Sequence, residues 1–116
     1  MLVDYNRLPE GGKGMGVPDG MTIDATGRLW VANYRGSGLY VFDPQRPDAL
    51  AEYVNVPAAC TTSLVFAGAN YNELYVTSSC VGYTAEEHAA DPLAGSIFHL
   101  TDLPGNPRGL PLDSMF

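Results

Sequence analysis

The stretch MTIDATGRLWVAN at residues 21–33 decides the fold, because it predicts two short strands joined by a tight turn. Residues 21–24 and 29–34 are rich in the β-branched and aromatic side chains that are typical of strands. Between them, Gly27 is free to take the positive φ that a hairpin turn requires. The stretch therefore predicts an antiparallel hairpin.

The same pattern returns in LVFAGANYNELYVTS at residues 64–78, with two extra residues in the turn. Ile23 and Phe66, which occupy equivalent places, are 43 positions apart. A further strand follows each hairpin, at residues 38–43 and 95–100. Three or four strands in a period of about 40–45 residues is the signature of a β-propeller blade. The alternative is a β-sandwich whose hairpins resemble each other by chance.

We expect an all-β chain with a single helical excursion. Residues 83–90 predict one or two helical turns, in which Thr84 is the N-cap and Glu87 completes a capping box. Turn signals rich in glycine and proline separate the strands. The expected strands are Leu2–Tyr5, Met21–Asp24, Leu29–Tyr34, Gly38–Phe42, Glu52–Val56, Ser63–Phe66, Glu73–Ser78 and Ser96–Leu100.

Composition narrows the class of protein. The 116 residues are enough for one small domain, and 46% of them are hydrophobic, which supports a core. The net charge of −7 argues against nucleic acid and against anionic membranes as partners. No apolar run approaches the ~20 residues of a spanning helix, and the first residues do not resemble a secretory leader. We therefore expect a cytoplasmic protein that binds small molecules or metal ions.

Two blades pose a problem, because a propeller needs about four to eight blades to close. An open pair of blades would leave an apolar face and an unpaired strand edge exposed. The chain is therefore expected to be a piece of a larger ring, or to assemble with copies of itself.

The segment VPDGMTIDATGRLWVA at residues 17–32 resembles the SMP-30/gluconolactonase/luciferin-regenerating-enzyme (regucalcin-like) family. The order and spacing of further short motifs extend the resemblance over nearly the whole chain. These motifs lie at residues 36–38, 42–44, 61–68, 74–78, 92–98 and 108–111.

The resemblance implies a six-bladed β-propeller with a divalent metal ion in its central channel. Six blades need about 260 residues, so residues 1–116 are expected to be the C-terminal part of one incomplete propeller domain, about two to three blades. Ca²⁺ is the expected cofactor, with Zn²⁺, Mn²⁺ or Mg²⁺ as alternatives. The expected partners are a small-molecule lactone and the remaining blades, on the same longer chain or from self-association.

Asp19 is the candidate site residue, with both a catalytic and a metal-binding role. The family holds its metal through a Glu near the N-terminus, an Asn in a middle blade and the Asp that Asp19 matches. The resemblance implies that Asp19 binds the metal and acts as base on the attacking water in sugar-lactone hydrolysis. From the residues alone, a turn role in which the side chain bonds its own backbone is favoured.

The other family ligands have no counterpart in this chain, so the sequence leaves two alternatives to hydrolysis. One alternative is a calcium-binding regulatory or interaction module without catalysis. Another is a truncated form with no function of its own.

Thr61, Thr62 and Ser63 begin the second blade. They face either the channel, where they bond substrate hydroxyls, or the sheet, where they make strand-entry hydrogen bonds, and the second role is favoured. The aromatic residues are expected to pack within or between blades: Trp30, Tyr40, Phe42, Phe66, Tyr75 and Phe98.

Cys60 and Cys80 become cross-strand neighbours if Val65 pairs with Tyr75. A disulfide is then geometrically possible, but free thiols are favoured. The two cysteines lack the spacing of a zinc site.

Overall fold

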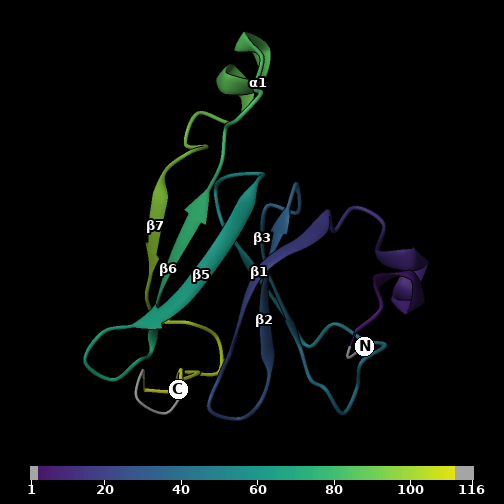
Figure 1. Cartoon of the computed structure of the whole chain (residues 1–116), viewed down its shortest axis with the longest axis vertical. Coiled ribbons are helices and arrows are strands. Elements are labelled where there is room, and N and C mark those ends of the chain that lie inside the picture. The colour runs from purple at the N-terminus through teal and green to yellow at the C-terminus, as the bar shows by residue number, and fades with distance from the viewer. Residues whose placement is uncertain (1–2, 112–116) are drawn as a thin grey trace.

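The computed structural model describes residues 3–111, which form two antiparallel sheets standing side by side (Figure 1). The first sheet has the order β1-β2-β3-β4 and the second has the order β5-β6-β7. Each sheet follows the chain in sequence order, so each is one blade of a propeller, as the repeat predicts. The strands are β1 (Val17–Ile23), β2 (Leu29–Tyr34), β3 (Gly38–Phe42), β4 (Glu52–Asn55), β5 (Thr61–Ala67), β6 (Glu73–Ser78) and β7 (Ile97–Leu100).

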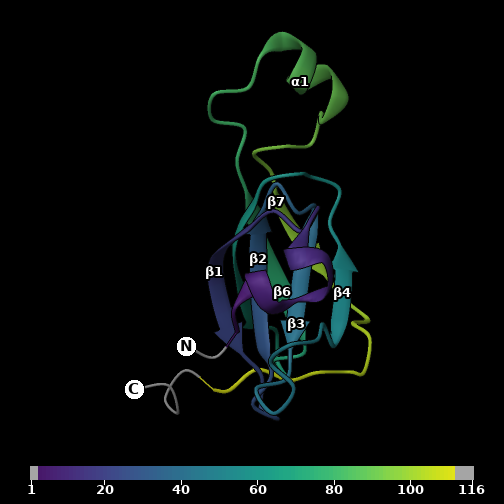
Figure 2. The same cartoon turned by 90° about the vertical axis from the view of Figure 1, so that its right-hand side faces the viewer.

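The helical excursion lies where the sequence predicts it, between β6 and β7. Helix α1 (Ala85–Ala90) begins with the expected capping box, in which Thr84 and Glu87 each bond the other's backbone N–H. In Figures 1 and 2 this helix stands beyond the end of the two sheets. No helix in residues 3–111 is long and apolar enough to cross a membrane.

The predicted first strand, Leu2–Tyr5, is wrong for its described residues, and Leu2 lies outside them. Asp4 instead accepts a hydrogen bond from the backbone N–H of Asn6 at 3.0 Å and caps a 3-10 turn, Tyr5–Arg7. Such a local side-chain bond competes with strand pairing. A second 3-10 turn follows at Pro9–Gly12.

The two blades pack face to face through one apolar core. Trp30 of β2 meets Phe66 of β5 edge to face, with ring centroids 5.5 Å apart, an arrangement that aromatic pairs prefer. Alternate residues of the central strands point into this seam because side chains alternate along a strand. Its buried members are Trp30, Ala32, Leu39, Val41, Val56, Leu64, Phe66, Leu74, Val76 and Leu103.

Tyr75 is not part of that core, which corrects the expectation that it packs between the blades. Its neighbours Leu74 and Val76 point into the seam, so Tyr75 points away from it and is 42% exposed. Its ring stacks on His99 with centroids 4.6 Å apart. The sequence pattern locates the strand, but the side that faces the neighbouring blade depends on packing between blades.

The other face of the first blade is covered by the N-terminal segment, residues 3–15. Leu8 of this segment is buried in a second apolar cluster with Leu29, Val31, Tyr40 and Phe42. The Tyr5 hydroxyl donates a hydrogen bond to Asn33 Oδ1 at 2.8 Å. Figure 2 shows the segment lying across this face of the sheet.

The first strand of each blade, β1 in one and β5 in the other, carries a β-bulge at the same place in the repeat. We call these two the inner strands. In β1 the register shifts between Pro18 and Met21, and in β5 it shifts between Thr61 and Ser63. The β1 bulge lets Gly20 approach β5 closely. A Cβ at position 20 would lie 2.7 Å from the Thr62 carbonyl oxygen and 2.6 Å from Ser63 Oγ.

The buried carboxylate of Asp24 organises the first hairpin. Its two oxygens accept hydrogen bonds from the backbone N–H groups of Thr26 and Arg28, the Thr26 hydroxyl, Arg28 Nε and Trp30 Nε1, at 2.6–3.2 Å. Burial alone raises the pKa of Asp24, but these hydrogen bonds outweigh it and hold the pKa below its usual range. Asp24 therefore fixes the turn and also accepts the hydrogen bond of the Trp30 indole N–H, which lies in the seam.

The C-terminal segment, residues 101–111, crosses the base of both blades (Figure 2). Arg108 accepts a hydrogen bond at its carbonyl from the N–H of Ala25 at 2.7 Å, and Gly109 donates one to the carbonyl of Tyr71 at 2.7 Å. The segment thus joins the turn of one hairpin to the turn of the other.

We expect Asp24→Asn to lower the free energy of unfolding by about 2–4 kcal/mol at pH 7, because its amide would oppose the Arg28 and Trp30 donors. The folded state depresses the pKa of Asp24, so its contribution is full above the unfolded value of about 4 and is lost as pH falls through the lower folded value. Urea unfolding measured from pH 7 to pH 2 should show the two stability curves converging in acid. If the stability difference between the two proteins stayed constant down to pH 2, the ionised carboxylate of Asp24 would not be the stabilising group.

We expect Gly20→Ala to destabilise the chain by about 3 kcal/mol, because the new Cβ meets the backbone of β5. Gly27→Ala is the matched control. Gly27 has φ of +88° and open space around its Cβ position, so only backbone strain of about 1 kcal/mol is expected there. Thermal unfolding of both variants makes the comparison, and equal losses would exclude the steric effect.

Candidate functional site

Asp19 lies within the bulge of β1, the innermost strand of the first blade, rather than just before the strand as the sequence suggests. The register pairs Pro18 with Asn33 and Met21 with Val31, so Asp19 and Gly20 share the space opposite Ala32. Asp19 is exposed. Bulges commonly re-aim a side chain beside an active site, and here the bulge takes the Asp19 carboxylate out of the regular ladder.

The carboxylate of Asp19 has no hydrogen-bond donor among residues 3–111. The alternative expectation, that Asp19 bonds its own backbone in a turn, is therefore not what the structure shows. The residue lies at the edge of an apolar recess of about 420 Å³. The other residues lining that recess are Val3, Pro18, Met21, Leu29, Val31 and Phe42.

Asp19 stands alone as a candidate metal ligand in this part of the molecule. Within the described chain, no group of three or more His, Cys, Asp or Glu side chains is placed to hold a metal ion. Ca²⁺ prefers six to eight oxygen ligands. These residues therefore offer one hard oxygen ligand and not a complete site.

Thr61, Thr62 and Ser63 take different roles. The buried Thr61 hydroxyl is shared between the carbonyl oxygens of Asn33 and Gly38, at 2.9 Å each, and so ties β5 to the first blade. Thr61 is therefore structural, as favoured from the sequence. Thr62 Oγ1 lies 2.7 Å from Thr77 Oγ1 on β6, and the Ser63 side chain is exposed.

Cys60 and Cys80 are free thiols, as expected. Val65 does pair with Tyr75. The β5 bulge then shifts the register by one residue, so the carbonyl of Cys60 accepts a hydrogen bond from the N–H of Ser79 at 2.9 Å. Cys80 is thus not the direct cross-strand neighbour of Cys60, because the expectation assumed an unbroken ladder.

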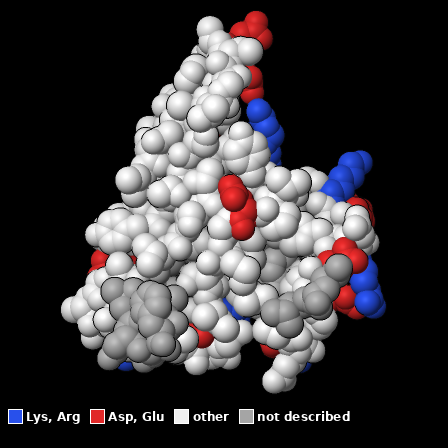
Figure 3. All heavy atoms as spheres, in the orientation of Figure 1, with Lys and Arg blue, Asp and Glu red and all other residues white. Residues whose placement is uncertain are grey.

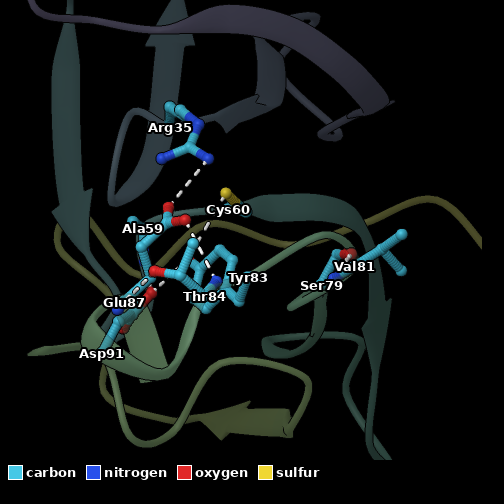
Figure 4. Close-up of polar contacts among 9 residues, drawn as sticks. All are labelled: Arg35, Ala59, Cys60, Ser79, Val81, Tyr83, Thr84, Glu87 and Asp91. Atoms are coloured by element: carbon cyan, nitrogen blue, oxygen red, sulfur yellow. Dashed lines mark hydrogen bonds and ion pairs between the residues drawn. The ribbon is translucent and has the colours of Figure 1, made fainter. Parts of the chain in front are cut away.

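A second polar group, which the sequence did not indicate, fastens the segment between β6 and β7 to the first blade (Figure 4). Asp91 Oδ2 accepts hydrogen bonds from the Tyr83 hydroxyl at 2.5 Å and from the N–H of Ala59 at 3.0 Å. The bond to Asp91 and burial raise the pKa of Tyr83 well above its usual range. We call the side chains Arg35, Tyr83, Glu87 and Asp91 the clasp.

Arg35 forms the other half of the clasp. Its guanidinium lies 3.2 Å from Glu87 Oε2, and its Cζ lies 5.9 Å from the centroid of the Tyr83 ring. The backbone N–H of Thr84 and the Arg35 guanidinium lower the pKa of Glu87. Both Arg35 and Glu87 reach solvent, so this pair contributes little to stability.

The clasp borders an open hollow of about 610 Å³ at the end of the molecule that carries α1. One wall is the last residue of β4 with the link that follows it, residues 55–59, and the other is α1 with the residues that follow it. Both carboxylates of the hollow, on Glu87 and Asp91, already have partners. These two carboxylates therefore hold the segment with α1 against the first blade and the link after β4, and neither is free to act as a catalytic group.

We expect Asp91→Ala to speed hydrogen exchange at the Ala59 amide about tenfold or more, and to cost about 1–2 kcal/mol, because Ala59 loses its acceptor. Asp48→Ala is the control. Asp48 pairs with Arg7 at 3.2 Å on the surface, where the cost is about 0–1 kcal/mol. Unchanged exchange at Ala59 would show that Asp91 does not fasten the segment.

Two adjacent blades whose inner strands carry matching bulges define part of a β-propeller. Residues 3–80 match the model of the "SMP-30/Gluconolactonase/LRE-like region" family. The chain therefore belongs to this family.

Relatives named regucalcin have sequences similar to that of this chain. The protein from Danio rerio is 42% identical over 99 residues, which is 85% of this chain and 32% of the relative. The protein from Homo sapiens is 45% identical over 87 residues, which is 75% of this chain and 29% of the relative. The chain thus spans about a third of the length of the relatives it matches.

Solved structures agree with the fold. A luciferin-regenerating enzyme superposes with a TM-score of 0.75 at 32% identity, over 94% of this chain and 34% of that one. A calcium-binding protein, regucalcin, from Agrobacterium tumefaciens superposes with a TM-score of 0.66 at 28% identity, over 72% of this chain and 28% of that one. The two blades are therefore part of a propeller of this type.

Proposed function

We propose that the chain is part of a divalent-metal-dependent hydrolase of sugar lactones, in which Asp19 is a metal ligand and the base. The observation that carries the proposal is the exposed Asp19 carboxylate, which a β-bulge holds on an inner strand without a hydrogen-bond donor from residues 3–111. Membership of the gluconolactonase-like family supports the reaction class.

The chemistry of the donor suits a hard cation. A free carboxylate is a ligand that Ca²⁺ and Mg²⁺ accept, and a regucalcin of similar structure is described as calcium-binding. We propose Ca²⁺ as the cofactor, with Zn²⁺, Mn²⁺ or Mg²⁺ as alternatives. Asp19 would supply one ligand, and the remaining ligands would come from water and from blades outside this chain.

In the complete site the cation would supply Lewis acidity toward the lactone carbonyl. Asp19 would hold the cation through its carboxylate and accept a proton from the attacking water at a carboxylate oxygen. Opening of the lactone ring would yield the aldonic acid. The partners of this chain in that reaction are the lactone and the missing blades, on a longer chain or on further copies.

A second function keeps the ion and omits the catalysis. The isolation of Asp19 from other metal-binding side chains among residues 3–111 favours a calcium-binding regulatory or interaction module when the chain acts by itself. Weak binding without turnover would distinguish this function from hydrolysis.

The test is a Ca²⁺ titration of the ¹⁵N-labelled chain followed by NMR. We expect the amide signals around Asp19 to shift with a weak affinity, of about millimolar Kd, and Asp19→Asn to abolish the shift. Asp102→Asn is the control, because Asp102 is exposed and lies in the C-terminal segment. A titration that Asp19→Asn leaves unchanged would refute the role of Asp19.

Hydrolysis of D-glucono-1,5-lactone with Ca²⁺ present tests the need for further blades. We expect no rate above that of buffer from the 116-residue chain. A clear metal-dependent rate that disappears in Asp19→Asn would show that the two blades suffice for hydrolysis. It would contradict the proposal that further blades are needed to complete the site.

A further inference from the structure

The segment between β6 and β7, residues 80–95, stands at the same end of the blades as Asp19. Val17 at the start of β1 pairs with Tyr34 at the end of β2, and Tyr34 also bridges Cys60, which directly precedes β5. Strand β6 runs antiparallel to β5, so β6 ends where β5 begins. We call residues 80–95 the α1 segment, which is the narrow projection at the top of Figure 3, with acidic side chains on its surface.

The α1 segment has little apolar surface to bury, whatever packs against it. Its large apolar side chains are Val81, Tyr83 and Leu93, and the apolar residues of α1 itself are all alanines. None of the residues of α1 is buried. Regions with few buried apolar contacts open at a low free energy compared with the whole domain. Polar contacts therefore hold the segment in place.

The clasp supplies these polar contacts. The N–H of Ala59 donates a hydrogen bond to Asp91 Oδ2 at 3.0 Å. The Arg35 guanidinium lies 3.2 Å from Glu87 Oε2 and faces the Tyr83 ring at 5.9 Å. Because Arg35 and Glu87 both reach solvent, their pairing adds little. Asp91 is therefore the main fastening of the segment.

Glycines stand near both ends of the α1 segment. Gly82 has φ of +78° with open space around its Cβ position, and Gly95 has φ of +90°. Glycine adopts such angles readily and has the widest backbone freedom of any residue. Large dihedral changes at a few positions at the ends of elements let a segment swing as a unit. The two glycines thus provide a hinge on each side of α1.

The thiol of Cys60 lies beneath the α1 segment and is fully buried. The Tyr83 hydroxyl lies 3.6 Å from Cys60 Sγ and donates a hydrogen bond to Asp91 (Figure 4). That bond keeps Tyr83 over the thiol. Movement of the segment away from the blades would take Tyr83 with it and uncover Cys60.

We propose that the α1 segment is a lid, which opens as a unit while both blades stay folded and which Asp91 holds closed. The buried members of the seam all come from outside the segment, so opening leaves the apolar core intact. The open lid uncovers Cys60 and widens access to the end of the blades at which Asp19 lies. This inference does not rest on the proposed lactonase activity.

The test is the rate at which iodoacetamide alkylates Cys60 in the Cys80→Ser background, where Cys60 is the remaining cysteine. We expect alkylation of the folded chain, and we expect Asp91→Ala to speed it about tenfold, because the lid loses its main fastening. Gly27→Ala is the matched control. It strains the first hairpin turn, outside the lid, so it lowers global stability and should leave the alkylation rate unchanged.

Urea unfolding of each variant supplies the global stability for comparison. Alkylation rates that follow global stability in both variants would show that Cys60 is reached only by unfolding, and would refute the lid. An unchanged rate in Asp91→Ala, or no alkylation of the folded chain, would refute it equally. Tyr83→Phe is a second variant, which keeps the ring and removes the hydrogen bond to Asp91, and it should also speed alkylation. Circular dichroism confirms that each variant is folded.

Discussion

Gly20 lies against the backbone of β5 with no room for a side chain, and this close approach of two inner strands sets the geometry of the blade pair. Because the strands meet there, the Thr61 hydroxyl reaches carbonyl groups of the first blade. The same approach lets Trp30 meet Phe66 in the seam. The bulge that brings Gly20 inward also lifts Asp19 from the ladder, so packing and candidate chemistry share one irregularity.

Local signals predicted the strands and the helix well. Turn residues and the alternation of side chains located the strands over 29–34, 38–42 and 73–78, and the capping box located α1. These features depend on residues close in sequence. The bulges were not predicted, because a bulge exists only relative to a partner strand, and the side toward which Tyr75 points depends on the neighbouring blade.

The sequence predicted less of the candidate site than of the fold. Asp19 was selected from a family resemblance and not from spacing, and the structure adds that its carboxylate is exposed and in a bulge. The clasp was not predicted. Its member Asp91 binds the backbone N–H of Ala59, which is 32 positions away, and no local pattern links a backbone N–H to a distant carboxylate. The burial of Asp24 was also not predicted, but for a different reason: its partners are close in sequence, and an aspartate is ordinarily at the surface.

The clasp and the C-terminal segment secure opposite ends of the seam. A seam fastened at one end can peel open from the other, so its contacts are lost one after another. Here neither end of the seam is free, because Asp91 makes hydrogen bonds at one end and the backbone of Arg108 and Gly109 makes them at the other. Separation of the two blades therefore requires the hydrogen bonds at both ends of the seam to break as well as the apolar contacts between them.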